Sequence, residues 1–419
     1  MSDFPEVGTL LSQANAHLQA NEIDAADAVY RRILDFDPVH KEATLRRITI
    51  ARRAGRRDDV FALIDVASRR APSNADWQVG RALALVELGR YDEAFESYDR
   101  AIVLQEDCAD AWFGKAQLLL QLGRYKEGWE LYEWRFYVSG LGGDTRLFRQ
   151  PLWGGGGFHG QMMLVHAEQG LGDTIQFYRF VHQARSFGGV IVEAQDRLVR
   201  LFASQPQAPL VIPVGQPLPM FDLQCPMMSL PMLLGTELHS IPSGPYLQAD
   251  PALSAAWAAR LPPPDGRLRV GISWASNPEG IAASHKTMSL QGLLDTLGNG
   301  PMIVSLQKDV PETDRAALKQ ATRVIDLGAA QADFADTAAI IDGLDLVISV
   351  DTAVAHLAGA LGQPVWIMLP EVADWRWLVG RGDSPWYPTA RLFRQTDPND
   401  WSSVMSAVGA ALHALPPRR

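Results

Sequence analysis

Apolar positions follow two different periods along the chain, and the change of period divides it. Up to about residue 135, apolar residues recur at helical spacing, which predicts a series of helices. From Met162 onward, short apolar runs rich in β-branched residues alternate with amphipathic segments. Such runs are typical of strands buried on both faces of a parallel sheet. The pattern therefore predicts a helical region followed by an α/β region.

The helical region repeats itself every 34 residues. Three positions stay in register over four copies: turn residues Asn21, Gly55, Gly89 and Gly123; small residues Ala26, Val60, Ala94 and Gly128; and large residues Tyr30, Ile64, Tyr98 and Tyr132. This period resembles the tetratricopeptide repeat, in which helix pairs stack into a solenoid with a concave groove. Such grooves usually hold a peptide or protein, so a protein partner is expected. The alternative is a short array that only extends the next domain.

The end of the last repeat is rich in aromatic residues, namely Trp129, Tyr132, Trp134, Phe136 and Tyr137. We interpret them as the seam between the repeats and the following domain. Glycine and proline stretches then mark the boundaries. The expected organisation is repeats over residues 1–138, a connector over 139–160, an N-terminal Rossmann-like half over 161–262 and a C-terminal Rossmann-like half over 263–419.

Strands are predicted at Met162–Ala167, Val190–Val192, Leu210–Val214 and Phe221–Leu223 in the first half, and at Val270–Trp274, Met302–Leu306, Val324–Asp326, Leu344–Val350 and Val365–Leu369 in the second. The strand ending at Val350 is followed by a tight turn and then a helix. Asp351 and Thr352 stand at the helix cap, and Ala353 and His356 lie in its first turn. Helix N-termini beyond the carboxyl ends of strands bind anions, so this turn is a candidate phosphate site. Many such units carry no ligand.

A second turn follows the first predicted strand of the α/β region. Gly170 and Gly172 permit a tight turn and close backbone approach, and Asp173 and Thr174 stand near the start of the next helix. Taken alone, this turn is better explained as an ordinary capped helix with Asp173 in its first turn.

Both turns resemble motifs of the heptosyltransferase-like glycosyltransferases, the glycosyltransferase 9 type with a GT-B fold. The resemblance implies that Asp173 is the base that deprotonates the acceptor and that Ser349, Asp351, Thr352, Ala353 and His356 bind the nucleotide-sugar diphosphate. It also implies a phosphate-binding cation, for which Lys286 is the first choice and Lys308 and Arg376 are the next. Glycine is common in that family where this chain has Ala353. Residues 166–174 are similar to bacterial proteins that join such repeats to such a domain.

Other residues at strand ends add to the candidate site. Gln307 and Asp326 follow predicted strands, where ligands gather, and are expected to contact the nucleoside. We find no carboxylate pair at Asp-x-Asp spacing after a strand, so we expect no required metal and no cofactor beyond the nucleotide-sugar substrate. The two cysteines, Cys108 and Cys225, are far apart and form no metal-binding or disulfide motif.

Composition narrows the class of partner. The net charge of -10 disfavours nucleic acid. No apolar run has the length of a membrane span, and the start of the chain lacks a signal-like segment, so the expectation is a soluble cytoplasmic protein.

The sequence thus favours a glycosyltransferase whose acceptor is a protein held by the repeats. Two alternatives remain. One is transfer to a lipopolysaccharide or small glycan with the repeats docking a partner. The other is a scaffold whose transferase domain no longer catalyses.

Overall fold

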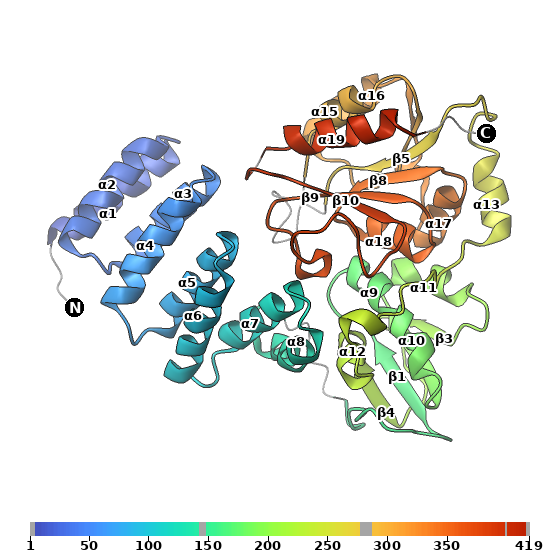
Figure 1. The fold of residues 1–419 in the computed structure, drawn as a ribbon, viewed down its shortest axis with the longest axis horizontal. Helices are drawn as coiled ribbons and strands as arrows, with labels where there is room; N and C mark the ends of the chain where they lie inside the picture. The colour runs from blue at the N-terminus through green and yellow to red at the C-terminus, as the bar shows by residue number, and fades with distance from the viewer. Residues whose placement is uncertain (1–4, 142–147, 277–286, 399, 416–419) are drawn as a thin grey trace. The chain divides into compact units, whose positions relative to one another are not determined.

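The computed structural model describes residues 5–141, 148–276, 287–398 and 400–415 (Figure 1). The chain divides into two compact units. One comprises Met1–Leu120 with Glu130–Gly142 and holds the repeats. The other comprises Gln121–Trp129 with Gly143–Arg419 and holds both α/β halves. Residues Gln121–Trp129 of the last repeat therefore group with the α/β unit, whereas the residues after them group with the repeats.

The repeat region is a run of helices, of which the first six each pack against the next. They are α1 (Pro5–Gln19), α2 (Ile23–Phe36), α3 (Lys41–Arg53), α4 (Arg57–Arg70), α5 (Ala75–Glu87), α6 (Tyr91–Leu104), α7 (Ala109–Gln121) and α8 (Tyr125–Tyr132), followed by the 3-10 turn η1 (Glu133–Tyr137). The predicted turn residues all have left-handed backbone, with φ of 59° at Asn21, 69° at Gly55, 70° at Gly89 and 79° at Gly123. Glycine adopts this conformation freely and asparagine tolerates it, which explains the residue types at this position.

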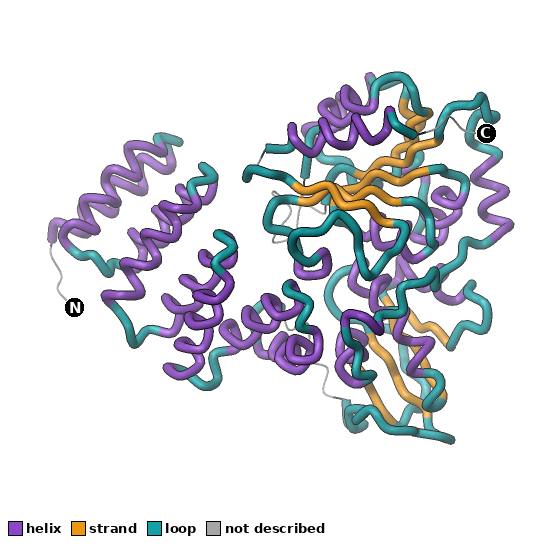
Figure 2. Tube along the Cα trace, in the orientation of Figure 1, coloured by secondary structure: helices purple, strands orange, loops and turns teal. Residues whose placement is uncertain are grey.

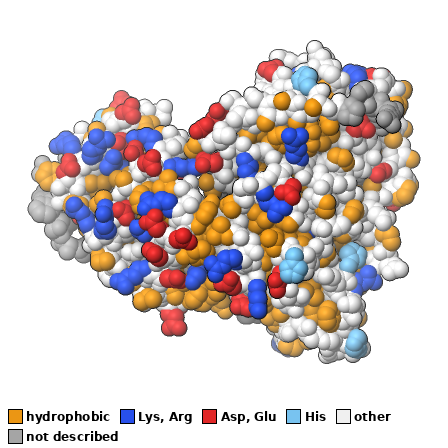
Figure 3. Space-filling view, in the orientation of Figure 1, with side chains coloured by type: hydrophobic (Ala, Val, Ile, Leu, Met, Phe, Trp, Pro, Cys, Tyr) orange, Lys and Arg blue, Asp and Glu red, His pale blue; other side chains and the backbone are white. Residues whose placement is uncertain are grey.

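Small and large residues alternate where the helices cross. Ala26, Val60 and Ala94 are completely buried. The large position is buried as well, and the ring of Tyr98 lies so close to Gly114 that a Cβ there would come within 2.6 Å of it. The helices approach closely because these small residues face large ones, as the repeat pattern predicts. Charged side chains of both signs cover the repeat surface (Figure 3).

The first α/β half is a parallel sheet with strand order β3-β2-β1-β4 among the described residues. Its elements are β1 (Met162–His166), α9 (Leu171–Phe177), α10 (Arg179–Ala184), β2 (Gly189–Ala194), α11 (Asp196–Ala203), β3 (Leu210–Pro213), β4 (Leu223–Pro226), η2 (Met227–Ser229), α12 (Leu230–Leu233) and η3 (Leu238–Ser240). The predicted strand Phe221–Leu223 starts too early. Phe221 packs its ring on Phe148, and the carboxylate of Asp222 accepts a bond from the Met162 N–H, so both residues precede β4.

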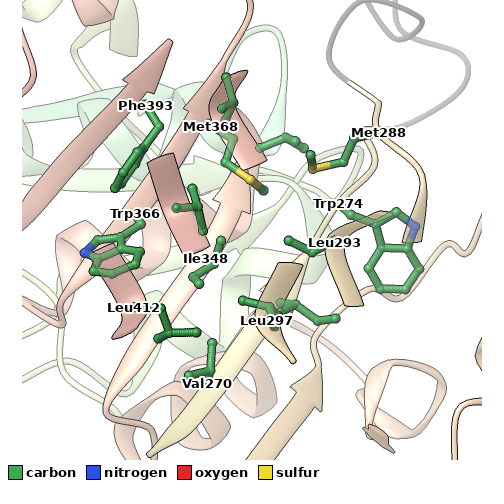
Figure 4. Packing of buried hydrophobic residues seen from close by; sticks show 14 of the residues in the cluster. Val270, Trp274, Met288, Leu293, Leu297, Ile348, Trp366, Met368, Phe393 and Leu412 are labelled. Carbon is green, nitrogen blue, oxygen red and sulfur yellow. The ribbon is translucent and has the colours of Figure 1, made fainter. Parts of the chain in front are cut away.

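The second half is a parallel sheet of order β10-β9-β8-β5-β6-β7 in the part of the chain that is described (Figure 2). Its elements are α13 (Pro251–Ala258), β5 (Arg269–Ser273), α15 (Leu290–Leu297), β6 (Met302–Ser305), α16 (Glu312–Gln320), β7 (Val324–Asp326), η4 (Gly328–Ala330), α17 (Phe334–Asp342), β8 (Leu346–Val350), α18 (Ala353–Ala360), β9 (Val365–Leu369), η5 (Trp375–Trp377), β10 (Ala390–Arg394) and α19 (Ser402–His413). Residues of β5, β8 and β9 pack against α15 and α19 in one buried cluster (Figure 4).

Each sheet has a point where the strand order reverses. In the first half, β2 and β3 lie on one side of β1 while β4 lies on the other. In the second half, β6 and β7 lie on one side of β5 while β8 lies on the other. Ligands of open α/β sheets bind beyond the carboxyl ends of the strands at such points. The turn after β1 and the turn after β8 both lie there.

The two halves are tied together by bonds between their helices and by the segment that links them. Arg200 of α11 donates two bonds of 2.8 Å to the carboxylate of Asp333, which caps α17. The N–H groups of Tyr246 and Leu247 donate to the carbonyl of Ala360 at the end of α18, at 3.0 and 3.2 Å. These bonds join α11 to the start of α17, and the linking segment to the end of α18.

The aromatic residues at the end of the repeats separate into two groups. The ring of Tyr132 packs on Phe113 and that of Trp134 stacks on Trp112, all within the repeat unit. Tyr137 is 74 % exposed. Trp129 instead packs inside the α/β unit, against Trp375. No described helix is both long and apolar enough to cross a lipid bilayer.

Candidate active site

The turn after β1 presents Asp173 in the first turn of α9. Its left-handed residue is Gln169, with φ of 50°, whereas Gly170 is extended with φ of -81°. We had expected the glycines to supply the turn conformation. Instead, they leave room for the groups that pack against the turn. A Cβ on Gly170 would come within 3.0 Å of the Asp173 carboxylate, and one on Gly172 would press on the other half of the unit. The Gly170 N–H donates to Oδ2 of Asp173 at 2.9 Å.

The other oxygen of Asp173 is bound by Arg376, from the η5 turn of the second half. Arg376 also donates from Nε to Oε1 of Gln176 at 2.6 Å and from Nη1 to Oδ1 of Asp374 at 2.8 Å. Its guanidinium lies 4.4 Å from the ring centre of Trp375, and the residue is only 6 % exposed. A carboxylate of one half is thus held by a fixed cation of the other.

Two opposing influences act on the Asp173 carboxyl. Burial raises its pKa above the ordinary value, while the Arg376 charge and the Gly170 N–H oppose that rise. Part of the side chain remains accessible, with 21 % exposed. Asp173 can therefore reach a substrate, and its proton affinity depends on Arg376.

The turn after β8 is built differently. Ser349 is completely buried; its hydroxyl donates to the Val350 carbonyl and also hydrogen-bonds with the Thr352 hydroxyl at 3.0 Å. Because the Thr352 hydroxyl is engaged there, it makes no cap bond to α18 within the described structure. The first N–H groups of α18, beginning at Ala353, therefore keep their capacity to meet an anion at the helix N-terminus.

His356 lies one turn into α18 and is 5 % exposed. Its Nδ1 hydrogen-bonds with the Tyr387 hydroxyl at 2.8 Å, and its Nε2 is 3.7 Å from Oδ1 of Asp351. The ring stacks on Trp377 with centres 5.4 Å apart. The Tyr387 ring reaches His356 across Gly359, where any Cβ would overlap it. Burial raises the pKa of Tyr387 well above its usual range, so the phenol stays protonated.

The two turns meet. A Cβ on Gly172 would lie 3.0 Å from Cδ2 of His356 and 3.5 Å from Cα of Ala353. The first turn of α9 therefore rests directly against the first turn of α18. Asp173, Ala353 and His356 come together although about 180 residues of chain separate them.

Another predicted residue, Gln307, is 6 % exposed and is hydrogen-bonded within the protein: Oε1 accepts from the N–H groups of Trp274 and Ala275, and Nε2 donates to the Ala275 and Asp309 carbonyls. Its amide thus joins the segments that follow β5 and β6. Lys286 lies outside the described residues.

A cavity of about 1180 Å³ lies beyond the ends of β6 and β7. Asp326 and Lys308 are part of its wall. Lys308 donates from Nζ to the carbonyls of Gln331 and Ala332 at 2.6 and 3.0 Å, so its charge is tied to the backbone. The cavity has room for a nucleoside. Nothing in the described ranges groups three or more His, Cys, Asp or Glu residues as a metal site.

Sequence reasoning missed Gln176, Asp374 and Tyr387. Gln176 acts through a partner far along the chain, since it and Arg376 are 200 residues apart. Asp374 binds Arg376 two residues away, and Tyr387 hydrogen-bonds with His356, 31 residues away. Arg376 was only a second choice as cation. The one available signal was a dense run of aromatic and charged residues around positions 374–387.

Family comparisons agree with both parts of the chain. A tetratricopeptide repeat model matches residues 11–75, 61–107 and 79–133. A model described as glycosyltransferase family 9 (heptosyltransferase) matches residues 303–367, which include the turn after β8. The chain joins tetratricopeptide repeats to a glycosyltransferase family 9 domain. The Asp173 turn of this domain lies outside the matched range.

One curated relative of this chain is Protein FlbA of Caulobacter vibrioides, which is 30 % identical to it over 314 residues. The match covers 67 % of this chain and 52 % of FlbA, so the chain spans about half the length of that relative.

Solved structures similar to the chain include a glycosyl transferase family 9 from Veillonella parvula, with 12 % identity and a TM-score of 0.44 over 62 % of this chain and 90 % of that one. A tetratricopeptide repeat protein from Parabacteroides merdae matches with 17 % identity and a TM-score of 0.28, over 32 % of this chain and 53 % of that one.

Proposed function

We propose that this chain is a glycosyltransferase that moves a sugar from a nucleotide-sugar to an acceptor hydroxyl. The observation that carries the proposal is the contact between the two turns, which brings Asp173 beside the N-terminus of α18. Transfer needs a base on one side of the sugar and countercharge for the diphosphate on the other. The two turns offer one of each.

In the proposed reaction, Asp173 takes the proton of the acceptor hydroxyl as its oxygen bonds to the sugar anomeric carbon. The bond from that carbon to the diphosphate breaks, and the diphosphate leaves with its electron pair. The amides at the start of α18, with Thr352, Ala353 and His356, meet the phosphates, and Arg376 adds positive charge. One displacement at the anomeric carbon inverts its configuration. We assign Ser349 and Gln307 a positioning role, because the protein itself occupies their polar atoms.

We place the nucleoside in the cavity beside Asp326, which lies at the same carboxyl edge of the sheet as the α18 turn, with the end of β5 between them. We also propose a GT-B enzyme that needs no metal, since helix amides and Arg376 supply the countercharge that a cation otherwise provides. Turnover should then survive a chelator, and turnover that disappears with EDTA and returns with a divalent cation would refute this part.

The finer proposal is that the acceptor is a protein held by the repeats. A cavity of about 410 Å³ lies between α2, α3 and α4 and is lined by four arginines, Arg31, Arg47, Arg56 and Arg70. Three of them already bind carboxylates, Arg31 and Arg47 at Asp27 and Arg56 at Asp59, so an acidic segment would share these cations and also meet Arg70. Transfer to a lipopolysaccharide or small glycan remains the alternative, and a non-catalytic scaffold is a third.

A donor panel tests the proposal. The full chain is titrated with UDP-, GDP- and ADP-sugars, and with a CMP-sugar, which lacks a diphosphate, as control. A true donor should raise the unfolding temperature, because it binds the native state, and should release its nucleoside diphosphate. Stabilisation without release indicates the scaffold. Neither effect with any donor would refute the proposal.

The acceptor class is tested with labelled donor and Arg70→Glu in the 410 Å³ cavity. Label entering protease-sensitive material should fall in this variant, while donor hydrolysis stays unchanged. Arg100→Glu, an exposed charge reversal on α6 outside the cavity, is the control. Label found only in protease-resistant glycan would favour the alternative. Point changes are preferable to removing the chain before Trp153, because that deletion also removes residues of the α/β unit.

A further inference from the structure

Two residues of the last repeat belong to the α/β unit and lie behind its candidate site. Tyr125 and Trp129, at the start of α8, are 1 % and 2 % exposed. The Tyr125 hydroxyl accepts a bond of 3.1 Å from Nε1 of Trp386, and Trp129 packs edge-on against Trp375 with ring centres 5.3 Å apart. We name these four residues the aromatic clamp.

The aromatic clamp contacts or adjoins two groups of the candidate site, Arg376 and the Tyr387–His356 pair. The ring of Trp375 lies under the Arg376 guanidinium that binds Asp173. Trp386 directly precedes Tyr387, which hydrogen-bonds with His356. The clamp rings also contact one another, with Tyr125 and Trp386 5.9 Å apart and Trp375 and Trp386 6.1 Å apart. The η5 turn and the Trp386 segment are therefore packed on the same two residues of α8.

The repeat pattern explains why α8 makes this contact. Trp129 stands 68 residues, or two repeat periods, after Phe61. In the second repeat, Phe61 is covered by Arg81 and Arg90, which belong to the next helix pair. In the last repeat no further helix pair follows, and Trp375 covers the equivalent position. A surface that normally joins one repeat to the next here joins the last repeat to η5.

We infer that Tyr125 and Trp129 are positioning residues of the transferase site, which hold Arg376 on Asp173 through Trp375 and Trp386. This inference rests on the proposed function. Tyr125 and Trp129 are almost fully buried and contact Trp375 and Trp386, so they act on Arg376 through these rings. Loosening them frees η5, weakens the Arg376 contact and leaves the Asp173 carboxyl more easily protonated.

The test measures donor hydrolysis against pH in the full chain. Trp129→Leu should lower the rate and shift the acid limb upward by about half a pH unit or more, part of the one to three units that an adjacent opposite charge supplies. Tyr125→Phe removes only the hydroxyl and should shift it less. Trp134→Leu is the matched control, because Trp134 stacks on Trp112 within the repeat unit and should leave the limb in place.

A double variant shows whether the shift acts through Arg376. In an Arg376→Gln background, Trp129→Leu should shift the limb no further. Equal rate losses in Trp129→Leu and Trp134→Leu with an unmoved acid limb would overturn the inference and leave the proposed function standing. If Trp129→Leu fails to fold, Tyr125→Phe decides.

If the wild type hydrolyses no donor, the proposed function fails on its own. The positioning of Arg376 is then read from the titration of the Asp173 side chain by carbon-labelled aspartate NMR. An upward shift in Trp129→Leu and Tyr125→Phe, absent in Trp134→Leu, supports the inference. An unchanged titration overturns it.

Discussion

The two halves of the α/β unit carry the same local motif, a strand, a tight turn and a helix, but use it in different ways. After β1 the functional group is a carboxylate, held by a guanidinium that comes from the other half. After β8 it is a helix N-terminus, and its neighbours Ser349 and His356 are held from within the same half. The motif alone therefore does not assign a role. The residues that reach each turn from elsewhere in the fold do.

The largest expected effect comes from the carboxylate of the first turn. Asp173→Asn removes the base but keeps the shape of the side chain, and should lower donor turnover about 100- to 10,000-fold, the range for general acid–base catalysis. Turnover and the unfolding temperature are measured together. Asp374→Asn, which removes another carboxylate on the same arginine, is the control and should cost much less. Near-normal turnover of folded Asp173→Asn would rule out the base role.

The Arg376 guanidinium, which binds the first turn but not the second, should affect how donor turnover depends on pH. Asp173 must be deprotonated to act, so the rate rises as pH passes its pKa. Burial raises that pKa, and the Arg376 charge and the Gly170 N–H oppose the rise, so Arg376→Gln removes the larger of the two opposing influences. The acid limb should move to higher pH by about one to three units, the usual effect of one close charge. A limb that stays in place or moves to lower pH would show that Arg376 does not control Asp173.

Changes in the second turn should alter the affinity for the donor and leave the pKa of the base unchanged. His356→Gln removes a ring that hydrogen-bonds with Tyr387 and stacks on Trp377. It should raise KM for the donor roughly tenfold, about the loss of one hydrogen bond to a charged group, with no change in the acid limb. Tyr387→Phe keeps the ring and should have a smaller effect of the same kind. A shift of the acid limb in His356→Gln would mean that the two turns do not have separate roles.

The smallest effect tests the contact between the turns. Gly172→Ala places a Cβ 3.0 Å from the His356 ring, which has to move by a few tenths of an ångström. Turnover should fall about two- to tenfold, since small misplacements of reacting groups are costly. Gly300→Ala, where the added carbon meets nothing within 4 Å, is the control. Equal turnover in both variants would show that the turns need not touch.

Much of this fold is predictable from the sequence, because its elements are local. The period of 34 residues identifies the repeats, and apolar runs mark β7 and β9 to the residue. The edge strand β10 was missed because the exposed Arg391 interrupts its apolar run. The bounds of β4 were wrong because pairing, not apolar character, decides where a strand begins.

The site was predictable only in part. Asp173, Ala353 and His356 sit in turns with local signals, and the structure brings them together. Ser349 and Gln307 have the right chemistry at strand ends, but their polar atoms are hydrogen-bonded within the protein. No local pattern in the sequence reveals these bonds. The bond from Arg376 to Asp173 joins residues 203 apart, and only the folded chain brings them into contact.

The most direct test is a structure of the full chain with the donor that stabilises it most. The account predicts the diphosphate at the first N–H groups of α18, beside Ala353 and His356, with the sugar anomeric carbon facing Asp173. A diphosphate bound away from this turn, or a sugar pointing away from Asp173, would contradict it.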